Sequence, residues 1–181
     1  MDSVHSFGIS LSNKELIKQI ELWFRKRNPK HVKMLRNDQP SQDPDDDYQV
    51  VFEIVFEPHD SRRARIELWL TESGNIGLGI EQRRRVARAL DLQSTSPRFA
   101  GGFEPMKVPY QAIEKFLDLV ADGRLAMRYV VVPLFGILYS MPSLQLAEIE
   151  NLKEIGFPVS DCLMTAESPH VLTKTLRYEP W

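Results

Sequence analysis

The sequence predicts an α+β fold in which an antiparallel sheet of about five strands carries three or four helices on one side. Residues 48–57 are rich in β-branched and aromatic side chains, and residues 66–80 show the period of two that marks half-buried strands. Apolar residues at spacings of three and four over 13–27, 109–123 and 143–155 have the period of a helix instead. Consecutive strands with helices before and after them are typical of this fold class.

Length and composition predict one domain over 1–181, located in the cytoplasm. The chain has 181 residues, of which 43% are hydrophobic and 27% are charged, as in ordinary globular proteins. The N-terminus lacks a cationic start followed by an apolar run, and no apolar stretch is long enough to span a bilayer. The only cysteine, Cys162, excludes an internal disulfide and favours a reducing compartment.

The first helix is expected at about 13–27. Ser12 and Glu15 have the spacing of a capping box, in which each side chain accepts a hydrogen bond from the other residue's backbone amide. An apolar stripe at helical spacing follows. Pro29 should stop the helix, because the residue before a proline disfavours helical geometry.

The first third of the chain divides into two segments of opposite charge. Residues 1–37 hold eight Lys and Arg against three acids, a net charge of +5. Residues 38–60 hold eight acids and no Lys or Arg, a net charge of −8. Residues 37–47 combine Asp with Pro, Gln and Ser and contain no apolar residue, which predicts a mobile acidic loop. Calcium binding is not predicted there, because the glycine and the final glutamate of an EF-hand loop are missing.

The hairpin over 62–80 is the organising element of the predicted sheet. A two-residue loop would place the apolar rows of its two strands on opposite faces. A three-residue loop, Ser73-Gly74-Asn75, brings Leu68 opposite Ile80 and keeps both rows on one face. Such a loop needs one residue in the left-handed conformation, for which its last two residues are suited.

The predicted register collects arginines at the end of the hairpin far from the turn. Arg65 would lie near Arg83 and Arg63 near Arg85, and a helix starting near Glu81 would point its arginines away from its apolar side. Cations this close need an acidic counterpart, supplied either by the chain itself or by another protein. The nearby acids of the chain are Glu57, Asp60, Glu67 and Glu81. The candidate partner-binding residues, which we call the arginine patch, are Arg63, Arg65, Arg83, Arg84, Arg85 and Trp69.

The second half of the chain begins with a long loop, expected over 93–108 because Ser, Thr, Gly and Pro are frequent there. The elements expected after it are a helix at 109–123, apolar strands at 125–132 and 134–139, a helix at 143–155 and an edge strand at 171–178.

The sequence contains no catalytic, metal-binding or cofactor-binding motif. Cys162 and the four histidines show no nucleophile signature, and there is no Gly-x-Ser-x-Gly elbow. The histidines stand far apart, without an HExxH or a paired-cysteine motif. The glycine-rich run at 74–79 follows a hairpin turn and lacks the pattern of a phosphate-binding loop. No metal and no cofactor is therefore predicted.

These features predict a non-catalytic, cytosolic protein-binding module that uses charge-segregated surfaces to recognise an acidic partner. Small bacterial immunity or antitoxin-like proteins are of this type, which is an analogy of kind and not a sequence match. One alternative is an enzyme whose site is assembled from distant His, Cys and carboxylate residues. Another is a nucleic-acid binder that uses the arginine patch, although a net charge of −2 disfavours binding a polyanion.

Overall fold

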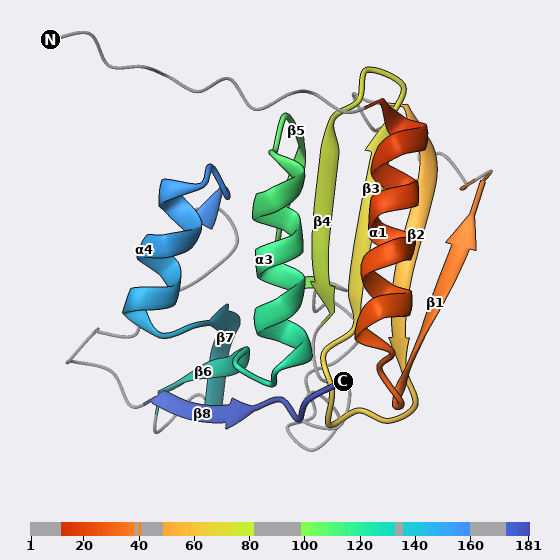
Figure 1. Cartoon of the computed structure of the whole chain (residues 1–181). Helices are drawn as coiled ribbons and strands as arrows, with labels where there is room; N and C mark the ends of the chain where they lie inside the picture. The colour runs from red at the N-terminus through yellow and green to blue at the C-terminus, as the bar shows by residue number, and fades with distance from the viewer. Residues whose placement is uncertain (1–11, 39, 41–48, 82–98, 133–135, 160–172) are drawn as a thin grey trace, which may run out of the picture.

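The computed structural model describes residues 12–38, 40, 49–81, 99–132, 136–159 and 173–181. In chain order the elements of this part are α1 (Asn13–Arg27), β1 (Val32–Asn37), β2 (Val50–Pro58), β3 (Ile66–Thr71), β4 (Ile76–Glu81), β5 (Phe99–Met106), α3 (Tyr110–Ala121), β6 (Ala126–Val132), β7 (Gly136–Ser143), α4 (Leu146–Glu154) and β8 (Thr173–Arg177) (Figure 1). Several predictions concern residues outside this part, namely most of the acidic loop at 37–47, Arg83, Arg84 and Arg85 with the helix expected to carry them, and Cys162.

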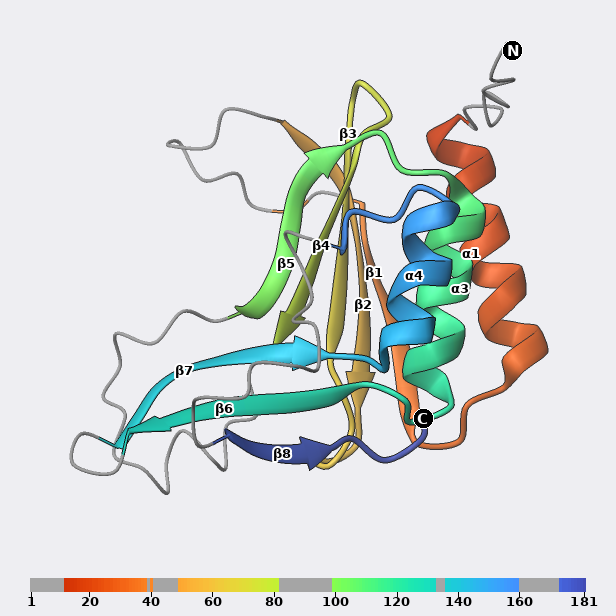
Figure 2. The same cartoon turned by 90° about the vertical axis from the view of Figure 1, so that its left-hand side faces the viewer.

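The strands form two antiparallel sheets. The larger sheet has five strands in the order β1-β2-β3-β4-β5, so each strand pairs with its neighbour in the chain. The smaller sheet has three strands in the order β7-β6-β8. Figure 2 shows α1, α3 and α4 on the same face of the five-stranded sheet. The predicted α+β class and the predicted layering are therefore confirmed, with three helices in the part of the chain that the structure describes.

The core lies between the helices and the five-stranded sheet because one face of β2, β3 and β4 is uniformly apolar. Ile66, Leu68 and Leu70 in β3 are fully buried. Residues that are paired across neighbouring strands point to the same face of the sheet. Each of these three residues is therefore the middle member of an apolar row that crosses β2, β3 and β4. The rows are Phe56-Ile66-Ile80, Ile54-Leu68-Leu78 and Phe52-Leu70-Ile76.

The last four residues, 178–181, pack against this core. The Trp181 ring stacks on Phe56 with centroids 5.1 Å apart, and its indole Nε1 donates a hydrogen bond of 2.9 Å to the carbonyl oxygen of Ala64. The backbone amide of Trp181 donates to the carbonyl oxygen of Ala121 at 3.1 Å. The segment that follows β8 is thus attached both to the start of β3 and to the end of α3.

The hairpin of β3 and β4 has a different register from the predicted one. Leu68 lies opposite Leu78, not opposite Ile80. The loop has three residues as expected, but they are 72–74, because the amide of Thr71 donates to the carbonyl oxygen of Asn75 at 3.0 Å. Gly74 adopts a left-handed conformation with φ of 77°, as three-residue hairpin loops require.

Two strands of the larger sheet were not predicted. Residues 32–37 form the edge strand β1, which pairs with β2. Residues 99–106 form β5, where a continuous loop was expected over 93–108. At Gly102 in β5, φ is 154° and an added Cβ would lie 2.1 Å from the carbonyl oxygen of Leu78. The glycine therefore reflects close approach of β5 to β4 and not an irregular loop.

The remaining elements form near the expected residues, but some bounds and the grouping differ. The strand expected at 134–139 is β7, which runs over Gly136–Ser143, so residues 140–143 are strand as well. The helices expected at 109–123 and 143–155 form as α3 and the shorter α4. The expected tail strand is β8, which pairs with β6. The strands β6, β7 and β8 make a sheet of their own, whereas a single sheet was predicted.

Candidate functional site

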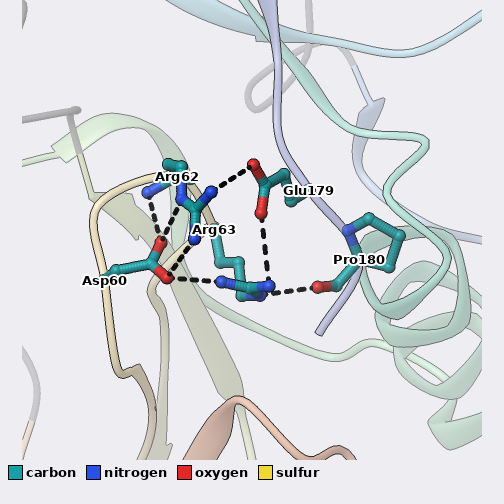
Figure 3. A network of polar contacts seen from close by, with 5 residues as sticks. All are labelled: Asp60, Arg62, Arg63, Glu179 and Pro180. Atoms are coloured by element: carbon teal, nitrogen blue, oxygen red, sulfur yellow. Dashed lines mark hydrogen bonds and ion pairs between the residues drawn. The ribbon is translucent and has the colours of Figure 1, made fainter.

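Arg63, the first residue of the arginine patch, is buried in a network of ion pairs within the chain (Figure 3). Its side chain is 9% exposed, and its Nη1 lies 2.5 Å from Oδ2 of Asp60. Its Nη2 lies 3.2 Å from Oε2 of Glu179, and its Nε donates to the carbonyl oxygen of Pro180 at 2.8 Å. Arg63 thus joins the loop before β3 to the segment after β8.

The neighbouring Arg62 completes this network. Its guanidinium lies 3.2 Å from Asp60 and 3.2 Å from Glu179. Hydrogen bonds from the side chain and the backbone of Arg62, together with the nearby positive charges, lower the pKa of the Asp60 carboxyl from its ordinary 3.8 to about 2. The acids and arginines at this end of the hairpin therefore neutralise one another.

Arg65, the second residue of the arginine patch, is surrounded by three glutamates on adjacent strands. It forms ion pairs with Glu57 in β2 and with Glu67 in β3, and its Nη1 lies 3.4 Å from Oε2 of Glu81 in β4. Burial alone would lower the pKa of Arg65, but the hydrogen bond to Glu57 and the three negative charges raise it. The predicted approach of Arg65 to Arg83 depended on the wrong register, since Glu81 occupies the position opposite Arg65.

Trp69 is half-buried on the face of the sheet that is opposite to the helices. An added Cβ on Gly77, its cross-strand neighbour, would lie 2.7 Å from Cε3 of the indole ring. A glycine at this position leaves room for the tryptophan that lies across it. Trp69 also borders a cavity of about 380 Å³ with Gly101, Gly102 and Met106. The structure does not bring Trp69 into the network of Arg63, and Arg83, Arg84 and Arg85 lie outside the described residues.

A second group of arginines, not predicted from the sequence, lies on the three-stranded sheet and in the segment just before β6. Arg124, Arg128 and Arg177 line a cleft of about 270 Å³, which we call the three-arginine cleft. Its other lining residues are Ala126, Ser143, Leu144, Gln145 and Thr175. No Asp or Glu is among these described lining residues.

The pairing of the strands explains why these side chains converge. Arg128 in β6 lies opposite Thr175 in β8, and Arg177 lies opposite Ala126, two residues away along β6. Residues two apart in a strand point to the same face, so Arg128 and Arg177 are diagonal neighbours. The alternating residues Met127 and Tyr129 are buried on the other face and attach the strand to the core.

The three-arginine cleft differs from the arginine patch in its electrostatics. Arg177 is exposed and forms no ion pair with another residue of the described part. The side chain of Arg124 is 55% exposed, and its ion pair within the described part is a long contact of 3.9 Å with Glu148. An exposed pair at this distance contributes little. Arg124 and Arg177 therefore contribute positive charge to this cleft, whereas acids surround Arg63 and Arg65.

Neither metal ligands nor a membrane helix is found in the described part of the chain. It holds no group of three or more His, Cys, Asp or Glu side chains placed to bind a metal ion. None of its helices combines the length and the apolar character needed to cross a membrane. Comparison of the chain with known proteins finds no matching family model, no matching curated protein and no matching solved structure. The function must therefore be inferred from the residues themselves.

Proposed function

We propose that this chain is a non-catalytic protein-binding module that recognises an acidic site on another protein through the three-arginine cleft. The observation that carries the proposal is the charge of this cleft, which three guanidinium groups line without a carboxylate among the described lining residues. Opposite charges steer association and select among partners. An acidic partner was already expected from the sequence, and the cleft provides a surface suited to it.

We place the binding surface at this cleft and not at the arginine patch because of the cost of releasing Arg63 and Arg65. Their guanidinium groups are already bound by carboxylates of the chain. To bind a partner they would leave Asp60, Glu57 and Glu67 without these contacts, and separating a largely buried ion pair is costly. Arg177 has no such contact with a described residue, so binding there breaks no ion pair within the described part of the chain.

The chemistry of the cleft favours binding over catalysis. Guanidinium groups stay protonated at neutral pH and donate hydrogen bonds, which suits them to holding an anion. The described lining residues include no histidine, cysteine or carboxylate to act as a base or a nucleophile. An immunity or antitoxin-like role would be one form of this function, with the partner as its target.

The test compares partner capture by three forms of the tagged full chain at low salt. The double variant Arg124→Glu/Arg177→Glu reverses the charge of the cleft. The control variant Lys18→Glu/Arg25→Glu makes the same change in net charge on the exposed side of α1. Proteins captured from a lysate of the source cells are quantified by mass spectrometry, and thermal unfolding confirms that all three forms are folded.

We expect an acidic protein that the wild type and the control variant capture in equal amounts and that the cleft variant loses. Its binding should weaken as salt is raised, because exposed charges are screened. Equal capture by all three forms would reject the cleft as the binding surface. Capture of nucleic acid in place of a protein would favour the alternative function.

A further inference from the structure

The donors of the three-arginine cleft come from all three strands of the smaller sheet. Ala126 in β6 lies opposite Ser143 in β7 on one side and opposite Arg177 in β8 on the other. Arg128 lies opposite Thr175. Diagonal neighbours in an antiparallel pair lie roughly 7–8 Å apart, which two arginine side chains can span to reach one anion. The strand pairing therefore places guanidinium and hydroxyl groups around a single small volume.

The end of the cleft next to α4 adds a weaker positive field. Leu144 and Gln145 line this end, and Gln145 is the N-cap of the nine-residue helix α4. The positive end of a helix dipole favours an anion. The Glu148 carboxylate accepts a hydrogen bond from the backbone amide of Gln145, so its negative charge compensates part of this field. The arginines therefore supply most of the electrostatic attraction for an anion, and the N-terminus of α4 supplies a smaller part.

We propose that the group bound in this cleft is a phosphate monoester carried by a phosphorylated side chain of the partner protein, an inference that rests on the proposed function. A phosphate monoester at neutral pH has a charge of about −1.5 to −2 and three strong acceptor oxygens. Arginine forks bind such oxygens in pairs. A carboxylate offers one charge and two oxygens, so it accepts fewer of the hydrogen bonds that the guanidinium groups can donate.

The size of the cleft agrees with a single group. Its volume of about 270 Å³ lies below the range of roughly 300–1,000 Å³ that is usual for pockets that enclose whole small molecules. A phosphate on a side chain can enter while the rest of its protein stays outside. A polynucleotide instead needs cations along several consecutive phosphates, and the net charge of −2 does not attract it.

The first part of the test measures binding of a defined probe to the full chain. O-phosphoserine is titrated at constant ionic strength while the arginine Nε–Hε resonances are followed by NMR. We expect saturable shifts in the wild type and at least about tenfold weaker binding in Arg177→Glu. Arg177→Lys should bind more weakly than the wild type because a lysine lacks the bidentate fork. Arg25→Glu, a change on exposed α1, should bind like the wild type.

Acetate, inorganic phosphate and a short single-stranded DNA are compared as probes in the same titration. Inorganic phosphate should bind like O-phosphoserine, and acetate should bind much more weakly. Equal binding of acetate, or shifts that persist in Arg177→Glu, would overturn the inference. Tighter, arginine-dependent binding of DNA would overturn it in favour of a nucleic-acid ligand.

The second part separates this inference from the proposed function. The capture experiment is repeated after the lysate has been treated with a protein phosphatase. Loss of the arginine-dependent partner would support the phosphate monoester. Arginine-dependent capture that resists the phosphatase would overturn the phosphate inference and leave the proposed function standing. Phosphate binding together with arginine-independent capture would reject the proposed function instead.

Discussion

Replacing Arg63 by alanine should lower the stability of the fold, whereas replacing Arg177 by alanine should not. Arg63 is 9% exposed and contacts Asp60, Glu179 and the carbonyl oxygen of Pro180. Removing one partner of a buried ion pair typically costs about 3–5 kcal/mol, because the other charge stays buried without compensation. Asp60 and Glu179 are 35% and 40% exposed, so water recovers part of this loss. We therefore expect a loss of roughly 2–3 kcal/mol for Arg63→Ala.

Arg177→Ala is the matched control for this experiment. Its side chain is exposed and has no ion pair with a described residue, so the change should stay within about 0.5 kcal/mol. Urea unfolding followed by circular dichroism measures both variants, and the slope of the free energy against urea shows whether unfolding still exposes the same surface. A loss below about 0.5 kcal/mol for Arg63→Ala would refute the structural role that we give to its network.

Three further predictions concern the core, the strand β5 and acid stability. Trp181→Ala should cost about 3–5 kcal/mol and Trp181→Phe less, since phenylalanine keeps an aromatic ring next to Phe56 and loses the hydrogen bond to Ala64 and part of the ring volume; urea unfolding of both variants measures this. Gly102→Ala should cost at least about 2 kcal/mol, because its Cβ would meet the carbonyl oxygen of Leu78 at 2.1 Å; equal melting curves for variant and wild type would contradict this. Because folding lowers the pKa of Asp60 from 3.8 to about 2, its ion pairs should stabilise the fold above pH 3.8 and be lost as the pH falls toward 2. The stability difference between the wild type and Asp60→Asn should therefore shrink between about pH 5 and pH 2, and a difference that does not change with pH would count against this contribution.

Elements with local signals were predicted well. The capping box of α1 forms as expected, since Ser12 Oγ accepts from the amide of Glu15 and the Glu15 carboxylate accepts from the amide of Ser12. The helix begins and ends at the predicted residues, Asn13 and Arg27. In such elements the decisive contacts are between residues three or four apart, so the sequence alone contains them.

The register of the hairpin was wrong for a physical reason. The predicted and observed registers differ by two residues on one strand, and a shift of two leaves every side chain on the same face. The apolar pattern therefore cannot distinguish them. The turn decides the register. Oγ1 of Thr71 accepts a hydrogen bond of 3.1 Å from the amide of Asn75, so the loop begins and ends one residue earlier than predicted. That single shift places Glu81, and not Arg83, opposite Arg65.

The strand β5 was missed because its composition is that of a loop. Gly101, Gly102 and Pro105 are rare inside strands. They are accommodated because β5 is an edge strand with register shifts against β4. The close contact of Gly102 with Leu78 depends on a partner more than twenty residues away. No local pattern contains that information.

The candidate site was missed for a similar reason, since runs of charge in a sequence are poor guides to charge on the folded surface. The end of the basic segment 1–37 and part of the acidic segment 38–60 form the adjacent strands β1 and β2, in which Lys33 lies opposite Glu57. Arg36 also pairs with Glu21 at 2.7 Å. Conspicuous opposite charges that are close in sequence tend to neutralise one another on folding, because the connection between them is short.

Arg177 remains available to a partner, because it forms no ion pair with a described residue, and the contact of Arg124 with Glu148 is long. Arg124, Arg128 and Arg177 stand singly in the sequence, and the first and last are separated by more than fifty residues. They converge only because β8 pairs with β6. The one local signal is the arginine at position 128 inside an otherwise apolar strand, since a charged side chain in such a position must face solvent or a polar partner. A functional site is therefore better sought where isolated charges meet after strand pairing than where they are consecutive in the chain.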